Sequence, residues 1–85
     1  METVRIDRWL CAARIFQSRT QATDACVGGH VRLNGAAVRA SHPVRVGDSI
    51  SALAPRGPVV LEVVALAEKR LSPADARALY ADHSP

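Results

Sequence analysis

The stretch SRTQATDACVGGHVRLNG, residues 18–35, decides the fold, because its first half predicts a helix with both ends marked. Ser18 stands three residues before Gln21, which is the capping-box spacing, and Gln21 is expected to reach back to the Ser18 N–H. Small side chains follow at helical spacing, and Gly28-Gly29 ends the helix because glycine adopts the left-handed C-terminal conformation at little cost. We therefore expect a helix between Ser18 and the glycine pair.

The second half of the stretch predicts a strand and a tight turn. Residues 30–33 alternate polar and apolar side chains, as on a half-buried strand. Asn34-Gly35 favours a type I′ hairpin, because both central residues of that turn need positive φ. The chain is then expected to return as a strand over 36–39 and to break at 41–43.

Further strands are predicted downstream of the hairpin. Val44 and Val46 alternate with a polar residue, a Gly-Asp turn leads into a strand over 49–53, and a Pro- and Gly-containing turn follows. Residues 59–66 form the most β-prone run of the chain and are expected as a central strand.

Upstream of residue 18, an apolar stripe predicts a first helix. Side chains at i, i+3, i+4, i+7 and i+10 form it, namely Ile6, Trp9, Leu10, Ala13 and Phe16. We expect Asp7 as the N-cap, and Trp9 and Phe16 as core anchors rather than base-stacking platforms. Because only residues 15–18 separate the two helices, they are expected to form a helical hairpin.

The end of the chain predicts a short third helix. Ser72 is followed by a proline at the first helical position and by Asp75 three residues after the cap. Ala76, Leu79 and Tyr80 then share one helical face, which is expected to dock on the rest of the domain.

Length and composition bound the class of protein. An 85-residue chain is expected to form one domain. Residues 2–8 carry charges where a signal peptide needs an apolar stretch, and the longest apolar region, 59–67, is too short to span a bilayer. Cys11 and Cys26 allow at most one bridge and are expected to be reduced thiols. We expect a soluble, cytoplasmic, monomeric protein with no membrane partner.

The charge is distributed unevenly. Residues 1–45 contain seven arginines against three carboxylates, a net charge of +4, whereas residues 46–85 contain four basic side chains against five carboxylates, a net charge of −1. Arginine suits bidentate contact with phosphate, so the first half predicts a polyanion partner. The alternative is a solvated basic face with no partner.

No catalytic or metal-binding motif is visible, and we expect no enzyme activity, no metal and no cofactor. The two cysteines are not in a C-x-x-C arrangement, and the histidines lack ligand spacing to them. Cys26 is expected as a packed core thiol and Cys11 as a partly exposed one without a redox role. His30 is either a group that titrates beside phosphates or a plain surface histidine.

The candidate binding residues surround the two predicted helices and the hairpin. Ser18, Arg19 and Thr20 stand at the N-terminus of the second helix, where free N–H groups and the helix dipole favour an anion. Arg56, in a turn of the near-neutral half, is expected to contribute much less than Arg19. Since exposed aromatic residues for base stacking are missing, binding is expected to depend on phosphates and helix shape, with little direct reading of bases.

The motifs RIDRWL, SRTQA, GGHVRLNG and VRVGDSI, in this order over residues 5–53, resemble the S4 RNA-binding domain, first known from ribosomal small-subunit protein four. The resemblance implies an α+β fold in which an N-terminal helical hairpin packs on a small curved antiparallel sheet of four to five strands, here with a short C-terminal helix. It implies an RNA face formed by Arg5, Arg8, Arg14, Ser18, Arg19, Thr20, His30, Arg32 and Arg39.

The tail VVLEVVALAEKRLSPADARALY is similar to that of the stand-alone heat-shock protein of fifteen kilodaltons and its short relatives in ribosome-associated quality control. This similarity implies a non-enzymatic protein that binds ribosomal RNA on a large ribosomal subunit stalled with nascent-chain transfer RNA, with transfer RNA as a further partner. We expect an RNA-binding domain over residues 1–71, with residues 72–85 as a helix docked on it.

Two other functions stay open at this point. One is a detached RNA-targeting domain of an RNA-modifying enzyme, such as a pseudouridine synthase or methyltransferase. The other is a protein-interaction module that uses residues 59–66 or the last helix, although clustered arginines are unlike the charge-poor centre of a protein interface.

Overall fold

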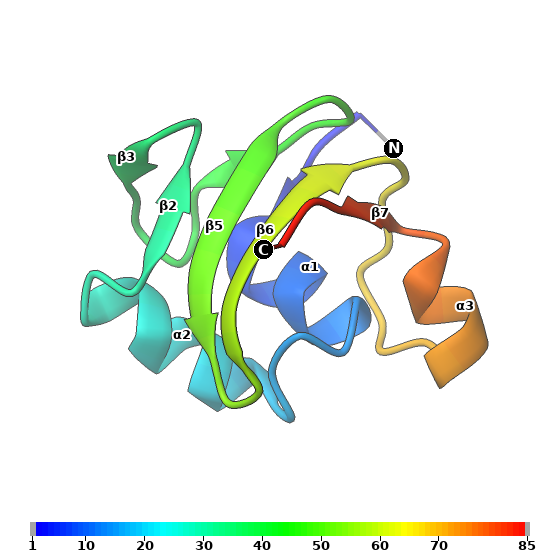
Figure 1. The fold of residues 1–85 in the computed structure, drawn as a ribbon, viewed down its shortest axis with the longest axis horizontal. Helices are drawn as coiled ribbons and strands as arrows, with labels where there is room; N and C mark the ends of the chain where they lie inside the picture. Colours follow the sequence, from blue (N-terminus) through cyan, green and yellow to red (C-terminus); the bar gives the residue numbers. More distant parts are fainter. Residues whose placement is uncertain (1, 85) are drawn as a thin grey trace.

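The computed structural model describes residues 2–84, which form three helices and seven strands (Figure 1). In chain order the elements are β1 (Val4–Arg5), α1 (Ile6–Ala12), α2 (Arg19–Val27), β2 (Val31–Leu33), β3 (Ala36–Ala37), β4 (Pro43–Val44), β5 (Ser49–Ala54), β6 (Gly57–Val63), α3 (Pro73–Arg77) and β7 (Tyr80–Asp82). None of the helices within residues 2–84 has the length and apolar character that a bilayer crossing requires.

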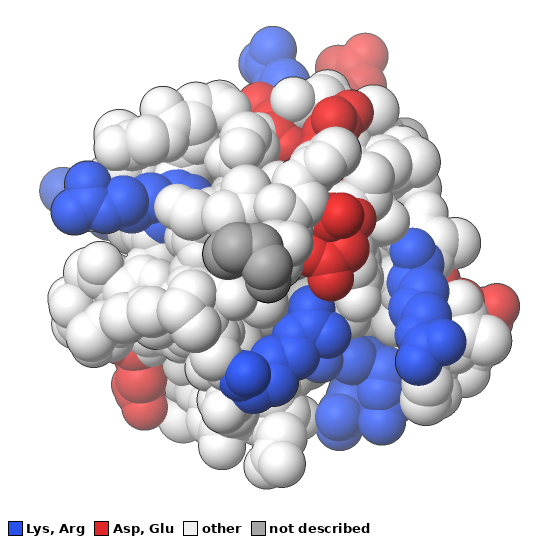
Figure 2. Space-filling view, viewed as in Figure 1, with Lys and Arg blue, Asp and Glu red and all other residues white. Residues whose placement is uncertain are grey.

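A curved five-stranded antiparallel sheet, in the order β3-β2-β5-β6-β7, forms one layer, and α1 and α2 lie behind it in Figure 1. Buried side chains alternate with more exposed ones along β2, β5 and β6, so one face of the sheet packs inward and the other faces solvent. Figure 2 shows from the same side that much of the outer face is uncharged. The α+β fold implied by the resemblance is confirmed.

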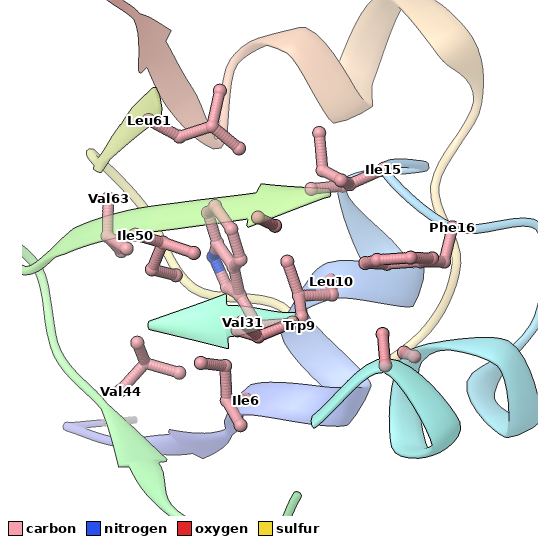
Figure 3. Packing of buried hydrophobic residues seen from close by; sticks show 14 of the residues in the cluster. Ile6, Trp9, Leu10, Ile15, Phe16, Val31, Val44, Ile50, Leu61 and Val63 are labelled. Atoms are coloured by element: carbon pink, nitrogen blue, oxygen red, sulfur yellow. The ribbon is translucent and has the colours of Figure 1, made fainter. Parts of the chain in front are cut away.

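The core between sheet and helices is centred on Trp9 (Figure 3). Trp9 is fully buried, and its indole Nε1–H donates to the Ala65 carbonyl oxygen at 2.9 Å. Its ring meets the Tyr80 ring edge-on, with centroids 6.4 Å apart. Phe16 is also buried, so the expectation that both aromatic side chains anchor the core is confirmed.

The first helix differs from its prediction at both ends. It begins at Ile6 with Arg5 at the N-cap position and no side-chain cap, so the expectation that Asp7 caps the helix is wrong. Asp7 lies inside the first turn, and its side chain is buried. The helix ends at Ala12, four residues before Phe16, which the apolar stripe had suggested as its last member.

The C-terminus of α1 is closed by a Schellman motif with an arginine in the usual glycine position. The Ile15 N–H donates to the Leu10 carbonyl at 3.0 Å, and the Arg14 N–H donates to the Cys11 carbonyl at 3.0 Å. Arg14 adopts φ of +59°, a left-handed conformation that costs a residue with a Cβ about 1–2 kcal/mol. The Arg14 side chain is thereby directed out of the helix at a defined place.

The second helix forms as predicted, with one change at its cap. The Ser18 Oγ accepts from the Gln21 N–H at 3.1 Å, which confirms the N-cap. The Gln21 Oε1 accepts from the Gln17 N–H at 3.2 Å, so the expected return bond to the Ser18 N–H is wrong. At the other end, Gly29 has φ of +77° and closes a second Schellman motif.

The hairpin after α2 also forms as predicted. Asn34 and Gly35 have φ of +51° and +87°, as a type I′ turn requires. The returning strand β3 covers only 36–37 instead of 36–39. Pro43, expected at a break, instead begins β4, which pairs only with β1, and a proline is tolerated in such an edge position.

The C-terminal part of the chain contains one strand that was not predicted. Ser72 caps α3, because its Oγ accepts from the Asp75 N–H at 3.3 Å, and Ala76 and Leu79 are buried. Tyr80 is in β7 rather than in the helix, and it pairs with Val63. β7 covers the free edge of β6, so β6 lies inside the sheet, although β5 is its middle strand.

Candidate nucleic-acid interface

The candidate interface is organised around the buried carboxylate of Asp7. Arg5 donates to both of its oxygens, from Nε to Oδ1 at 3.1 Å and from Nη2 to Oδ2 at 2.9 Å. The Arg8 N–H donates to Oδ1 at 2.7 Å, and the Thr23 hydroxyl donates to Oδ2 at 3.2 Å. Arg19 approaches the same oxygen, with its Nε 3.7 Å from Oδ2. We call Asp7, Arg5, Arg19 and Thr23 the Asp7 cluster.

The Asp7 cluster keeps its carboxylate ionised. Burial by itself raises the pKa of Asp7, but the hydrogen bonds from Arg5, the Arg8 N–H and Thr23 and the charge of Arg5 together hold the pKa below its usual value of 3.8. Two guanidinium groups therefore share one negative charge, which leaves this part of the surface positive.

The N-terminus of α2 lies at the edge of the Asp7 cluster. The Arg19 side chain is 51% exposed, so its guanidinium is guided by Asp7 without being enclosed. Thr20 is exposed beside it, and Ser18 caps the helix through the Gln21 N–H. The first-turn N–H groups of a helix have no partner within the helix and attract anions. Ser18, Arg19 and Thr20 are thus brought together with Arg5.

Two predicted residues of the α1 region take different positions. Arg8 is half-buried, and its Nε is buried without a hydrogen-bond partner among residues 2–84. Arg14 is exposed, but its Nη1 donates to the Leu71 carbonyl at 3.1 Å. Arg14 therefore faces the segment before α3 and is not part of the Asp7 cluster.

The hairpin residues face another direction. Arg32 is exposed between the buried Val31 and Leu33, so it lies on the outer face of the sheet, opposite the core. The exposed His30 lines a hollow on that face together with Arg32. Arg39 is exposed in the loop after β3, near the C-terminal end of α2. The structure does not bring these three residues into the Asp7 cluster.

Sequence reasoning missed the central role of Asp7, which was taken for a cap. A carboxylate among arginines, in the pattern Arg5-x-Asp7-Arg8, is the one available signal. The contacts with Arg19 and Thr23, which are 12 and 16 residues away, depend on how the two helices pack and have no local sequence signal.

The two thiols are free, and they differ in environment. Cys26 is buried, and this burial, with the nearby charge of Asp7, raises its pKa to about 11. Cys26 is therefore an inert core thiol at neutral pH, as predicted. Among residues 2–84, no group of three or more His, Cys, Asp or Glu side chains could hold a metal ion.

A helical hairpin on an antiparallel sheet, with arginines at a helix N-terminus and a carboxylate that orients them, defines a small RNA-binding domain. The S4 domain model matches residues 4–50, and the chain belongs to the S4 domain family.

Similar proteins fall into two groups. The Heat shock protein 15 homolog of Aeromonas salmonicida is 34% identical over 77 residues, which are 91% of this chain and 58% of that protein. The RQC P-site tRNA stabilizing factor of Helicobacter pylori is 44% identical over 48 residues, 56% of this chain and 57% of that protein. The chain thus spans less than three fifths of the length of these relatives.

The solved structures agree with this assignment. The trimeric Heat Shock Protein 15 of Vibrio cholerae superimposes with a TM-score of 0.90 at 30% identity, covering 95% of this chain and 82% of that one. The hypothetical protein HP1423 gives a TM-score of 0.77 at 32% identity, covering 95% and 98%. The trimer of the first structure differs from the monomer expected here.

Proposed function

We propose that this protein binds structured ribosomal RNA on a large ribosomal subunit that is stalled with nascent-chain transfer RNA. The names of the relatives, a heat shock protein and a factor that stabilises transfer RNA in the P site, support a role in stress or ribosome-associated quality control. The proposed location is the cytoplasm.

The observation that carries the proposal is the half-exposed Arg19 beside the N-terminus of α2. Asp7 restrains its guanidinium from one side, at 3.7 Å, while about half of the side chain stays accessible. An RNA phosphate at this helix end would receive hydrogen bonds from Arg19 and from first-turn N–H groups, and the helix dipole would add to the attraction. Arg5, 41% exposed on the other side of Asp7, adds a second positive charge.

The mode of binding follows from the side chains that are missing from the surface. Trp9 and Phe16 are buried, and Tyr80 is half-buried, and these three are the only Phe, Tyr and Trp residues in the chain. Because no such ring is exposed for base stacking, phosphate contacts and helix shape are proposed to supply the affinity. Arg8, Arg14, His30, Arg32 and Arg39, which lie outside the Asp7 cluster, are proposed as further RNA contacts.

Replacing Arg19 by alanine is expected to weaken binding to a large-subunit ribosomal RNA fragment by about 1–3 kcal/mol, the scale of a charged hydrogen-bonded contact. Affinity measured by fluorescence anisotropy with labelled RNA tests this expectation. Arg45→Ala, which removes the same charge from an exposed position in the β4–β5 turn, is the matched control and is expected to change affinity much less.

Thermal unfolding of the same variants separates binding from folding. If Arg19 serves only as a partner of Asp7, Arg19→Ala will lower the melting temperature and leave RNA affinity unchanged. That result would contradict a phosphate site at this helix end. Crosslinking in cells, followed by sequencing of the attached RNA, identifies the RNA: ribosomal RNA of the large subunit is expected, and its absence would refute the ribosomal role.

The protein is proposed to act as a monomer, in contrast to the trimer of the Vibrio cholerae relative. Within residues 2–84, the exposed large apolar side chains are Val27, Val46, Leu53 and Val64. They come from four different segments, and scattered apolar residues are normal for a monomer surface. Sedimentation of the purified chain at micromolar concentration tests this proposal, and a trimer would refute it.

A further inference from the structure

A second group of arginines converges outside the Asp7 cluster. Arg14 after α1, Arg56 in the β5–β6 turn and Arg77 in the last turn of α3 line one hollow of about 150 Å³, together with Tyr80. We call it the arginine hollow. In Figure 2, basic side chains gather at the lower right, between the β5–β6 turn and α3. Two of the three arginines, Arg56 and Arg77, lie outside the matched S4 region.

Arg14 enters the hollow from a strained backbone. It occupies the left-handed position of the Schellman motif, φ of +59°, where glycine would be free of strain. The Arg14 Nη1 donates to the Leu71 carbonyl at 3.1 Å, which ties the guanidinium to the segment that leads into α3. Backbone strain of this kind accumulates where a side chain has a function.

The other two arginines remain largely uncompensated. Arg56 lies 3.8 Å from Asp82, but both side chains are about half exposed, and such a surface pair contributes little. Arg77 has no carboxylate oxygen within 4.0 Å among the described residues. Three positive charges therefore meet at the hollow with one weakly held negative charge beside them.

The shape and chemistry of the arginine hollow fit one phosphate group. Its volume is below the range of about 300–1,000 Å³ that is typical of sites for larger organic ligands. Guanidinium groups match phosphate oxygens in bidentate geometry, and Tyr80 also lines the hollow. Ala13, Pro73 and Ala76 line the rest of the hollow.

We propose that the arginine hollow is a second phosphate-binding site that holds one backbone phosphate of the bound RNA through Arg14, Arg56 and Arg77. This inference rests on the proposed RNA binding and extends it, because it makes the C-terminal segment part of the RNA surface. It also changes the expectation that Arg56 contributes little to binding. That expectation was based on its position in the near-neutral half of the sequence.

The test compares the double variant Arg56→Gln/Arg77→Gln with Arg45→Gln, measured with the same ribosomal RNA fragment over a range of salt concentrations. Arg45 lies at the opposite end of β5 from Arg56. We expect the double variant to bind about tenfold or more weakly, and the slope of log K against log salt to become shallower by about 0.7–0.9, as for one lost phosphate contact. Glutamine keeps most of the side-chain stem, and circular dichroism confirms that each variant is folded.

If the wild type binds RNA and the double variant matches Arg45→Gln in affinity and slope, the second site is refuted while the proposed function stands. If the wild type does not bind RNA, titration of the protein with inorganic phosphate tests the arginine hollow independently of RNA. The NMR signals of the Arg14, Arg56 and Arg77 Nε–H groups should then shift more than that of Arg45. Equal shifts of all four signals would overturn the phosphate site. Shifts that a glutamate-rich peptide produces and inorganic phosphate does not would overturn it as well.

Discussion

At the scale of single residues, Asp7 determines where two of the arginines point. A buried carboxylate is costly unless hydrogen bonds compensate it, and here Arg5, Thr23 and a backbone N–H supply them. Because Arg19 also approaches this carboxylate, the positions of both guanidinium groups depend on one negative charge. The charge of Asp7 thus makes this surface less positive, but it also restricts the positions of the Arg5 and Arg19 guanidinium groups.

Asp7→Asn is expected to lower the free energy of unfolding at neutral pH by about 1–3 kcal/mol, the range for hydrogen bonds to charged groups. The pKa of Asp7 is depressed in the folded state, so the stabilisation is present above about pH 4 and is lost as the pH falls through the folded-state pKa. Wild type and variant should therefore differ most near pH 7 and converge below pH 4.

Urea unfolding at pH 7, 5 and 3 provides the measurement. The pKa of Asp82 is also lowered, by hydrogen bonds from Ser84, so only the difference between wild type and variant reports on Asp7. A difference that stays constant over this pH range would show that the charge of Asp7 is not responsible.

At the scale of elements, the β2–β3 hairpin depends on Asn34 in two ways. Asn34 has φ of +51°, and its Oδ1 accepts from the Ser49 N–H at 2.9 Å while its Nδ2 donates to the Asp48 Oδ1 at 3.2 Å. The side chain therefore joins the turn of the hairpin to the start of β5.

Asn34→Ala is expected to cost about 1–3 kcal/mol, the sum of left-handed strain and a lost hydrogen bond to Ser49. For a domain of this size the melting temperature should fall by roughly 5–15 °C. Asn34→Gly removes the same hydrogen bonds without strain and is expected to cost less. Equal melting temperatures for the two variants would argue against a contribution from backbone strain.

Elements with local signals were predicted well from the sequence. The caps at Ser18 and Ser72 and the Asn34-Gly35 turn each depend on a few neighbouring residues. β7 was missed, because Tyr80 continues the apolar face of α3 in sequence. The strand forms by pairing with the edge of β6, which has no local sequence signal. The early end of α1 was also missed, since it requires an arginine in a position that glycine usually occupies.

At the scale of the whole molecule, the distribution of basic residues along the sequence misleads about their distribution in space. Arg19 joins Arg5 because the two helices pack against each other, whereas Arg32 faces the opposite side of the sheet. Arg14, from the basic half, meets Arg56 and Arg77, from the near-neutral half. Such groupings depend on non-local packing, so the types of the binding residues could be predicted, but not their arrangement.

RNA binding by this surface is expected to depend strongly on salt, because arginine–phosphate contacts release counterions. The slope of log K against log salt should be negative, at about 0.7–0.9 per phosphate neutralised. Affinities for structured RNAs of unrelated sequence, measured in parallel, should be similar, because phosphates carry no sequence information. A flat salt dependence, or strong preference for one sequence, would contradict this mode of binding.

The position of Trp9 gives the protein a built-in optical reporter. It is the only tryptophan in the chain, it is fully shielded from water, and its indole is hydrogen-bonded to Ala65 near the C-terminal end of β6. Its fluorescence emission should shift to longer wavelength when the core opens, because water then reaches the ring, and should keep its wavelength when RNA occupies the surface. Unfolding can therefore be followed in the presence of RNA, without attaching a dye to the protein.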